Sequence, residues 1–83
     1  MSGTVSERVI GIASDVFGLA PREISASSAP ETVESWDSAR HLNFVLAIEE
    51  TFQLQLSPEE TDRIRNIGQA IELVEEKLRG AGA

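Results

Sequence analysis

Helix-start signals divide this sequence, and no segment alternates apolar and polar residues as a half-buried strand does. At three of the expected helix starts a short polar residue is followed three positions later by Glu or Gln, which is the pattern of a capping box. The pairs are Thr4 with Glu7, Ser57 with Glu60, and Asn66 with Gln69. The pattern predicts an all-α fold.

The helices are placed by these starts and by apolar residues that recur every three or four positions. We expect helices over about 4–17, from Asp37 and Ser38 to about 52, from Pro58 to about 65, and from about 67 to 79. These elements predict a small four-helix bundle of three longer helices and one short helix. We expect a single domain over 1–83, with an ordered core at about 4–79 and a flexible tail at 80–83.

A long connection separates the first two helices. Between residues 19 and 36 two prolines interrupt any periodicity, and only four side chains could anchor the segment inward: Leu19, Ile24, Val33 and Trp36. A structureless loop of more than roughly 15 residues in so small a domain counts either against the assignment or in favour of a functional architecture.

The size of the chain argues against an enzyme. A domain of 83 residues buries only roughly 60% of the surface that its unfolded chain exposes, so it can hardly also form a deep, water-excluding pocket. The absence of cysteine removes a disulfide scaffold, a Cys-ligated zinc site and a thiol nucleophile. We expect no catalytic residues and no metal site.

Negative charge is concentrated in the middle of the chain. The formal net charge is −7 at pH 7, and residues 31–62 contain eight acidic residues and one basic residue. This balance disfavours nucleic acid and anionic membranes and favours basic protein partners. No segment has the pattern of an export signal or a membrane span, so we expect a cytoplasmic, soluble monomer.

The helix that starts at Ser38 carries more apolar surface than a core face needs. Four residues form a sufficient core face, namely Phe44, Val45, Ile48 and Phe52. Leu42 and Leu46 extend the apolar arc until it ends beside Ser38. Either three neighbouring helices bury this wide arc, or the two leucines form a patch that faces a partner.

The segment Glu34-Ser35-Trp36-Asp37-Ser38, followed by Leu42-Asn43-Phe44-Val45-Leu46-Ala47-Ile48-Glu49-Glu50-Thr51-Phe52, resembles the acyl carrier proteins. The resemblance covers nearly the whole chain, since it includes the helix order, the long loop and the Asp-Ser pair at the start of the second helix. It implies that Ser38 receives 4′-phosphopantetheine from coenzyme A through a phosphopantetheinyl transferase that uses Mg²⁺. The thiol of the arm would then carry an acyl group as a thioester.

The resemblance also implies roles for the neighbours of Ser38. Asp37 would cap the helix and help the transferase to recognise the site, and His41 would either contact the phosphodiester or pack against Trp36. Residues for contact with acyl-loading and acyl-processing enzymes lie along the same helix: Ala39, Arg40, Leu42, Asn43, Leu46, Glu49 and Glu50.

Some positions differ from the usual pattern of the family. Ala39 stands where the family usually has Leu, and Arg40 and Asn43 stand where fatty-acid carriers commonly have acidic residues. The Trp-Asp-Ser start with His41 resembles discrete carriers of polyketide or other specialised biosynthesis.

Other interpretations of the same residues compete with this one. Ser38 could be an ordinary capping hydroxyl. The chain could be an aminoacyl or peptidyl carrier, or an unmodified helical adaptor that binds a protein through the second helix. A hydrolase built on Ser38 and His41 is improbable, because a triad needs an orienting acid beyond the histidine.

Overall fold

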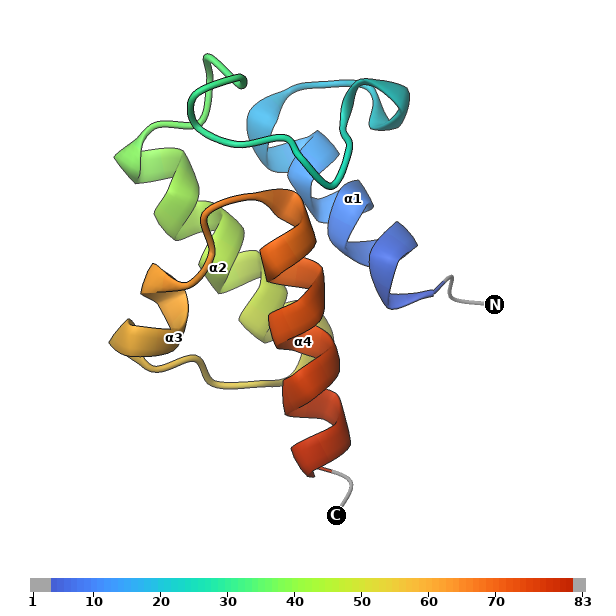
Figure 1. Ribbon diagram of the computed structural model, residues 1–83, viewed down its shortest axis with the longest axis vertical. Coiled ribbons are helices and arrows are strands. Elements are labelled where there is room, and N and C mark those ends of the chain that lie inside the picture. Colours follow the sequence, from blue (N-terminus) through green and yellow to red (C-terminus); the bar gives the residue numbers. More distant parts are fainter. Residues whose placement is uncertain (1–3, 82–83) are drawn as a thin grey trace.

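The computed structural model describes residues 4–81, and within this range the protein is helical throughout its regular structure (Figure 1). The helices are α1 (Val5–Phe17), α2 (Ser38–Phe52), α3 (Pro58–Asp62) and α4 (Ile67–Ala81), with one 3₁₀ turn, η1 (Pro21–Glu23). No strand occurs among the described residues. The prediction of an all-α fold with three longer helices and one short helix is confirmed.

Two helix ends differ from the prediction. The sequence predicts that the third helix continues to about Arg65, but α3 ends at Asp62. The chain turns there because Ile64 leaves the helix to become buried, and its N–H bonds to the carbonyl oxygen of Thr61. The sequence also predicts a flexible tail at 80–83, whereas α4 continues through Gly80 to Ala81. No proline stops the helix earlier, and residues 82–83 lie outside the described range.

The helix starts follow the capping signals with one variation. The reciprocal bonds of a capping box are present at Thr4 and at Ser57. At the start of α4 the Asn66 side chain accepts from the N–H of Gln69, but the Gln69 side chain accepts from the N–H of Arg65. The last box therefore reaches one residue further back than the pattern predicts.

The core lies where α1 packs against α2 and α4. The predicted core face of α2 is buried, and the core continues through α1 and α4 in the residues Val9, Ala13, Ile67, Ala70, Leu73 and Val74. Three aromatic rings from different segments meet at one end: Phe17 stacks on Trp36 with 4.6 Å between centroids, and Phe44 touches both.

The long connection crosses the end of the molecule at which α2 and α4 begin (Figure 1). Its predicted anchors Ile24, Val33 and Trp36 are buried. Its carbonyl oxygens at Ser28 and Ala26 accept from the first N–H groups of α4, on Ile67 and Gly68, at 3.0 and 2.8 Å. Helix starts leave such N–H groups unpaired, so the connection is an integral part of the bundle.

Candidate functional site

Asp37 caps α2, and Ser38 is the first residue of the helix. The Asp37 side chain accepts from the N–H of Arg40 at 2.8 Å and forms an ion pair with the Arg40 guanidinium at 3.2 Å. The interpretation of Ser38 as a capping hydroxyl is therefore wrong, because its neighbour already performs that task.

The Ser38 hydroxyl is exposed, and among residues 4–81 it has no hydrogen-bond partner. It lies at the first turn of a helix of 15 residues. There the unpaired N–H groups and the positive end of the helix dipole stabilise a negative group. The position therefore suits a hydroxyl that is to become a phosphate ester.

A groove of about 530 Å³ runs beside Ser38. Its walls come from the end of the long connection, the start of α2, and the end of α3 with the turn that follows. The lining residues are Pro30, Glu31, Trp36, Asp37, Ser38, His41, Asp62, Ile64 and Arg65. Arg65 is not among the predicted site residues, because no local pattern relates the turn before α4 to the start of α2.

His41 is bound by Trp36. The indole Nε1–H donates to His41 Nδ1 at 3.0 Å. Because an indole nitrogen can only donate, His41 Nδ1 carries no proton, and the proton of the neutral ring lies on Nε2. A serine nucleophile needs an unprotonated Nε2 and an Nδ1–H held by an acid. In His41 the proton lies on Nε2 and Nδ1 is bare, which is the reverse arrangement. The tautomer therefore argues against the hydrolase interpretation.

The predicted contact residues lie along the exposed side of α2. Leu42 and Leu46 are the large apolar side chains that the bundle leaves in solvent, at 57% and 50% exposed. The wide apolar arc is thus not buried by neighbouring helices. The smaller and polar members of the set are also exposed, namely Ala39, Arg40, Asn43 and Glu50.

Glu49 differs from the other predicted contact residues. It is half-buried, and its carboxylate accepts from the N–H of Leu56 at 2.8 Å. This bond holds the loop between α2 and α3, so Glu49 has an internal structural task. Its neighbour Glu50 projects outward.

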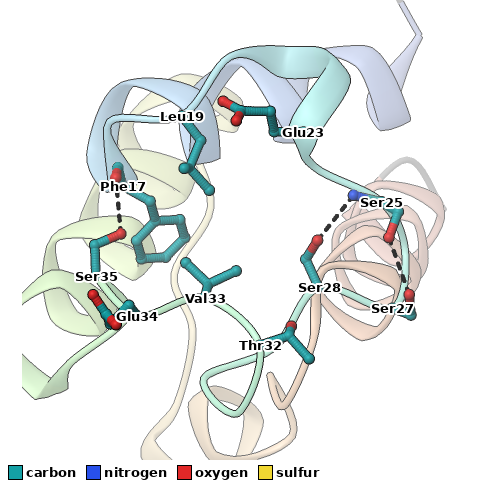
Figure 2. Close-up of a pocket in the computed structure, with 10 residues that line it drawn as sticks. All are labelled: Phe17, Leu19, Glu23, Ser25, Ser27, Ser28, Thr32, Val33, Glu34 and Ser35. Carbon is teal, nitrogen blue, oxygen red and sulfur yellow. Dashed lines mark hydrogen bonds between the residues drawn. The ribbon is translucent and has the colours of Figure 1, made fainter.

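A second cavity, of about 690 Å³, lies under the long connection on the side of α1 (Figure 2). Phe17, Leu19 and Val33 point into it (Figure 2), and serine side chains form its rim. All four serine hydroxyls are used locally: Ser35 donates to the carbonyl oxygen of Phe17, Ser28 accepts from the N–H of Ser25, and the hydroxyls of Ser25 and Ser27 bond to each other. Ser38 does not line this cavity. The stacked Phe17 and Trp36 rings lie between the cavity and the groove beside Ser38.

In residues 4–81 no three His, Asp or Glu side chains are grouped as metal ligands would be. No described helix has the length and hydropathy to cross a membrane.

The fold matches that of a known carrier protein. A solution structure of a holo acyl carrier protein from Geobacter metallireducens superposes with a TM-score of 0.82, covering 93% of this chain and 88% of that chain at 21% sequence identity. No protein-family model matches the chain. The chain therefore has the fold of an acyl carrier protein.

Proposed function

We propose that this protein is a carrier without catalytic activity of its own, which bears acyl groups as thioesters on 4′-phosphopantetheine attached to Ser38. The observation that carries the proposal is the exposed, unpartnered Ser38 hydroxyl at the start of α2, in a chain with the fold of an acyl carrier protein. In the modification, Ser38 Oγ displaces adenosine 3′,5′-bisphosphate from coenzyme A and loses its proton.

The residues around Ser38 fit such a group. The hydroxyl faces solvent, so a transferase can reach it, and the adjoining groove offers His41 and Arg65 as polar groups beside a phosphodiester. When bound, the group supplies a thiol that forms the thioester. Since the chain contains no cysteine, that thiol would be the only one in the protein.

The exposed side of α2 supports docking of partner enzymes. Leu42 and Leu46 supply an apolar centre, the same helix exposes Glu50, and residues 31–62 contain eight acidic residues and one basic residue. A surface of this kind complements enzymes with basic docking sites. We propose that the partners are a phosphopantetheinyl transferase and the acyl-loading and acyl-processing enzymes of a polyketide, other specialised or fatty-acid-like pathway. We also propose that the carrier is a cytoplasmic monomer.

The test is modification in vitro. The protein is incubated with coenzyme A, Mg²⁺ and a phosphopantetheinyl transferase of broad specificity, and the product is analysed by intact mass, peptide mapping and a thiol-specific label. We expect one added phosphopantetheine and one new thiol on Ser38. A panel of acyl-loading and aminoacyl-loading enzymes then separates the two kinds of cargo.

Matched serine variants locate the modification. Ser38→Ala should block it, whereas Ser27→Ala, which changes another exposed serine, should leave it intact. Failure of several transferases to add mass to the wild-type protein would refute the carrier proposal and favour the adaptor. Addition that persists in Ser38→Ala would refute the site.

A further inference from the structure

The long connection is joined to α2 by one side-chain pair next to the candidate site. Trp36 is 5% exposed and its ring is held between Phe17 and Phe44, with centroid distances of 4.6 and 5.7 Å. His41, on the next turn of the helix from Ser38, supplies the acceptor for the indole N–H. Packing thus fixes the position of the indole, and His41 provides the hydrogen-bond acceptor for its one polar group, the N–H.

The bond exists in only one charge state of the histidine. Both ring nitrogens of an imidazolium carry protons, so a protonated His41 presents Nδ1–H to a donor. The ring centroids are 6.1 Å apart with planes inclined by 21°, and the two nitrogens meet at the ring edges. His41 is therefore not over the indole face, where a cation would be attracted. Protonation replaces an attraction by a repulsion.

Charged groups from each neighbouring segment share the groove with His41. The long connection contributes Glu31, α3 contributes Asp62, and the turn before α4 contributes Arg65. At the start of α2, Asp37 lines the groove and is paired with Arg40. Among the described residues Glu31, Asp62 and Arg65 form no ion pair, so two carboxylates and one guanidinium share the groove with His41.

We propose that the hydrogen bond between Trp36 and His41 is a protonation-sensitive latch, which ties the indole N–H to α2 while His41 is neutral and is lost when His41 is protonated. Packing against Phe17 and Phe44 keeps the indole itself in place in both states. Glu31 and Pro30, which precede Trp36, form one wall of the groove beside Ser38. His41 lines the same groove, so opening the latch frees its side chain beside Ser38. The latch is a property of the unmodified chain and does not depend on the proposed function.

A negative group on Ser38 biases the latch, and this second step rests on the proposed function. Residues three apart in a helix are neighbours on its surface, so a phosphodiester on Ser38 lies beside His41. Its charge favours the imidazolium, so the latch opens at higher pH in the modified protein. Modification of Ser38 and opening of the latch are thereby coupled.

The single tryptophan provides a direct test, because the chain has one Trp and no Tyr. The indole N–H cross-peak in a ¹H–¹⁵N NMR spectrum of the unmodified protein and the His41 ring resonances are followed across about pH 8 to 5, the range in which imidazoles titrate. We expect both to change with one midpoint, while far-UV circular dichroism shows that the helices persist.

Two histidine variants separate the latch from general effects of acid. In His41→Asn an amide oxygen attached to Cγ replaces Nδ1 as an acceptor that does not titrate, so the indole peak should stay at its bonded position at every pH. In His41→Phe no acceptor remains, so the peak should lie at the released position even at about pH 8. An indole peak that ignores the titration of His41, or that still titrates in His41→Asn, would overturn the latch.

Comparison with the modified protein tests the coupling separately. We expect the midpoint to be higher after transfer of phosphopantetheine to Ser38. Successful modification with an unchanged midpoint would refute the coupling and leave the carrier function standing. If no transferase modifies Ser38, the carrier function and the coupling both fail, whereas the latch is decided by the unmodified protein alone.

Discussion

Asp37 and Ser38 are both residue types that cap helices, and their positions on the backbone separate their roles. Asp37 is the residue before the helix and bonds the N–H of Arg40, while the Ser38 hydroxyl makes no bond within the described range. This division leaves the serine available for chemistry at no cost to the helix.

The division predicts unequal effects of two adjacent substitutions. Asp37→Ala should lower the free energy of unfolding by about 1 kcal/mol through loss of the cap, whereas Ser38→Ala should change it by less than about 0.5 kcal/mol. Urea denaturation followed by circular dichroism measures both, and Asp37→Asn should retain most of the stability because Asn also caps. Equal losses in the two alanine variants would show that Ser38 shares the cap.

Leu42 and Leu46 are predicted to contribute to partner binding and little to stability. Because both are at least half exposed, Leu42→Asp and Leu46→Asp should each change the free energy of unfolding by less than about 1 kcal/mol. Turnover of the loaded carrier by a partner enzyme should fall at least tenfold, as expected when a charge enters an apolar contact.

Ile48, on the opposite face of α2, is the control. It is fully buried, so Ile48→Ala should cost about 2–5 kcal/mol of stability. If the leucine variants unfold as readily as this control, the patch belongs to the core. If they fold and turn over normally, it has no part in docking.

At the scale of elements, the long connection and the start of α4 depend on a close approach at Gly68. A Cβ at this position would lie 3.1 Å from the carbonyl oxygen of Ala26 and 3.3 Å from its Cβ. The same carbonyl oxygen accepts from the N–H of Gly68. A side chain at residue 68 therefore pushes the connection away from the helix that it caps.

Gly68→Ala is predicted to destabilise the protein, although alanine is the better helix former. Gly11→Ala is the matched control, because Gly11 lies inside α1 with nothing within 4 Å of an added Cβ. It should raise the free energy of unfolding by about 0.5–1 kcal/mol. Thermal and urea unfolding of the two variants should move in opposite directions, and a stabilised Gly68→Ala would show that the connection can shift freely.

At the scale of the whole molecule, α3 is too short to be stable alone. Ion pairs join it to α4: Glu60 with Lys77, and the C-cap residue Arg63 with Glu76. The Lys77 ammonium lies 3.0 Å from both oxygens of the Glu60 carboxylate, which also accepts from the N–H of Ser57. The bond from the backbone of Ser57, followed by the contact with Lys77, lowers the pKa of Glu60 below its ordinary value of 4.5.

The sign of the resulting pH dependence follows from this lowered pKa. The unfolded chain takes up the proton first, so the stabilisation by Glu60 is complete above pH 4.5 and is lost as pH falls from there through the lower pKa of the folded state. Urea unfolding at successive pH values should show the difference between wild type and Glu60→Gln shrinking in acid. Lys77→Met should reduce this difference, and a constant difference at all pH values would contradict the assignment.

The helices and most of the core could be predicted because their signals are local. Caps, prolines and the spacing of apolar residues lie within a few positions of the structure that they specify, as at Thr4 and Ser57. The match in fold to an acyl carrier protein agrees with the resemblance of the segment around Ser38. The errors fell at helix ends, where packing of Ile64 overrode the local pattern.

The site was predictable only in part. The serine at the helix start follows from the capping pattern. Helical geometry left open whether Leu42 and Leu46 face a partner or neighbouring helices, and only their exposure in the structure decides this. The bond from Trp36 to His41 and the presence of Arg65 in the groove do not follow from local patterns, because they depend on how the connection and the turn before α4 lie against α2.

The sequence by itself determined the four helices, their apolar faces and the serine at the start of α2, since each is specified by short-range sterics and hydrogen bonding. Only the tertiary structure decided which of Asp37 and Ser38 caps the helix, that Glu49 turns inward, and which ring nitrogen of the neutral His41 carries the proton. Each of these outcomes depends on a partner from another segment or on exact backbone position. The free energy that favours one arrangement over the other therefore arises only when the segments pack together.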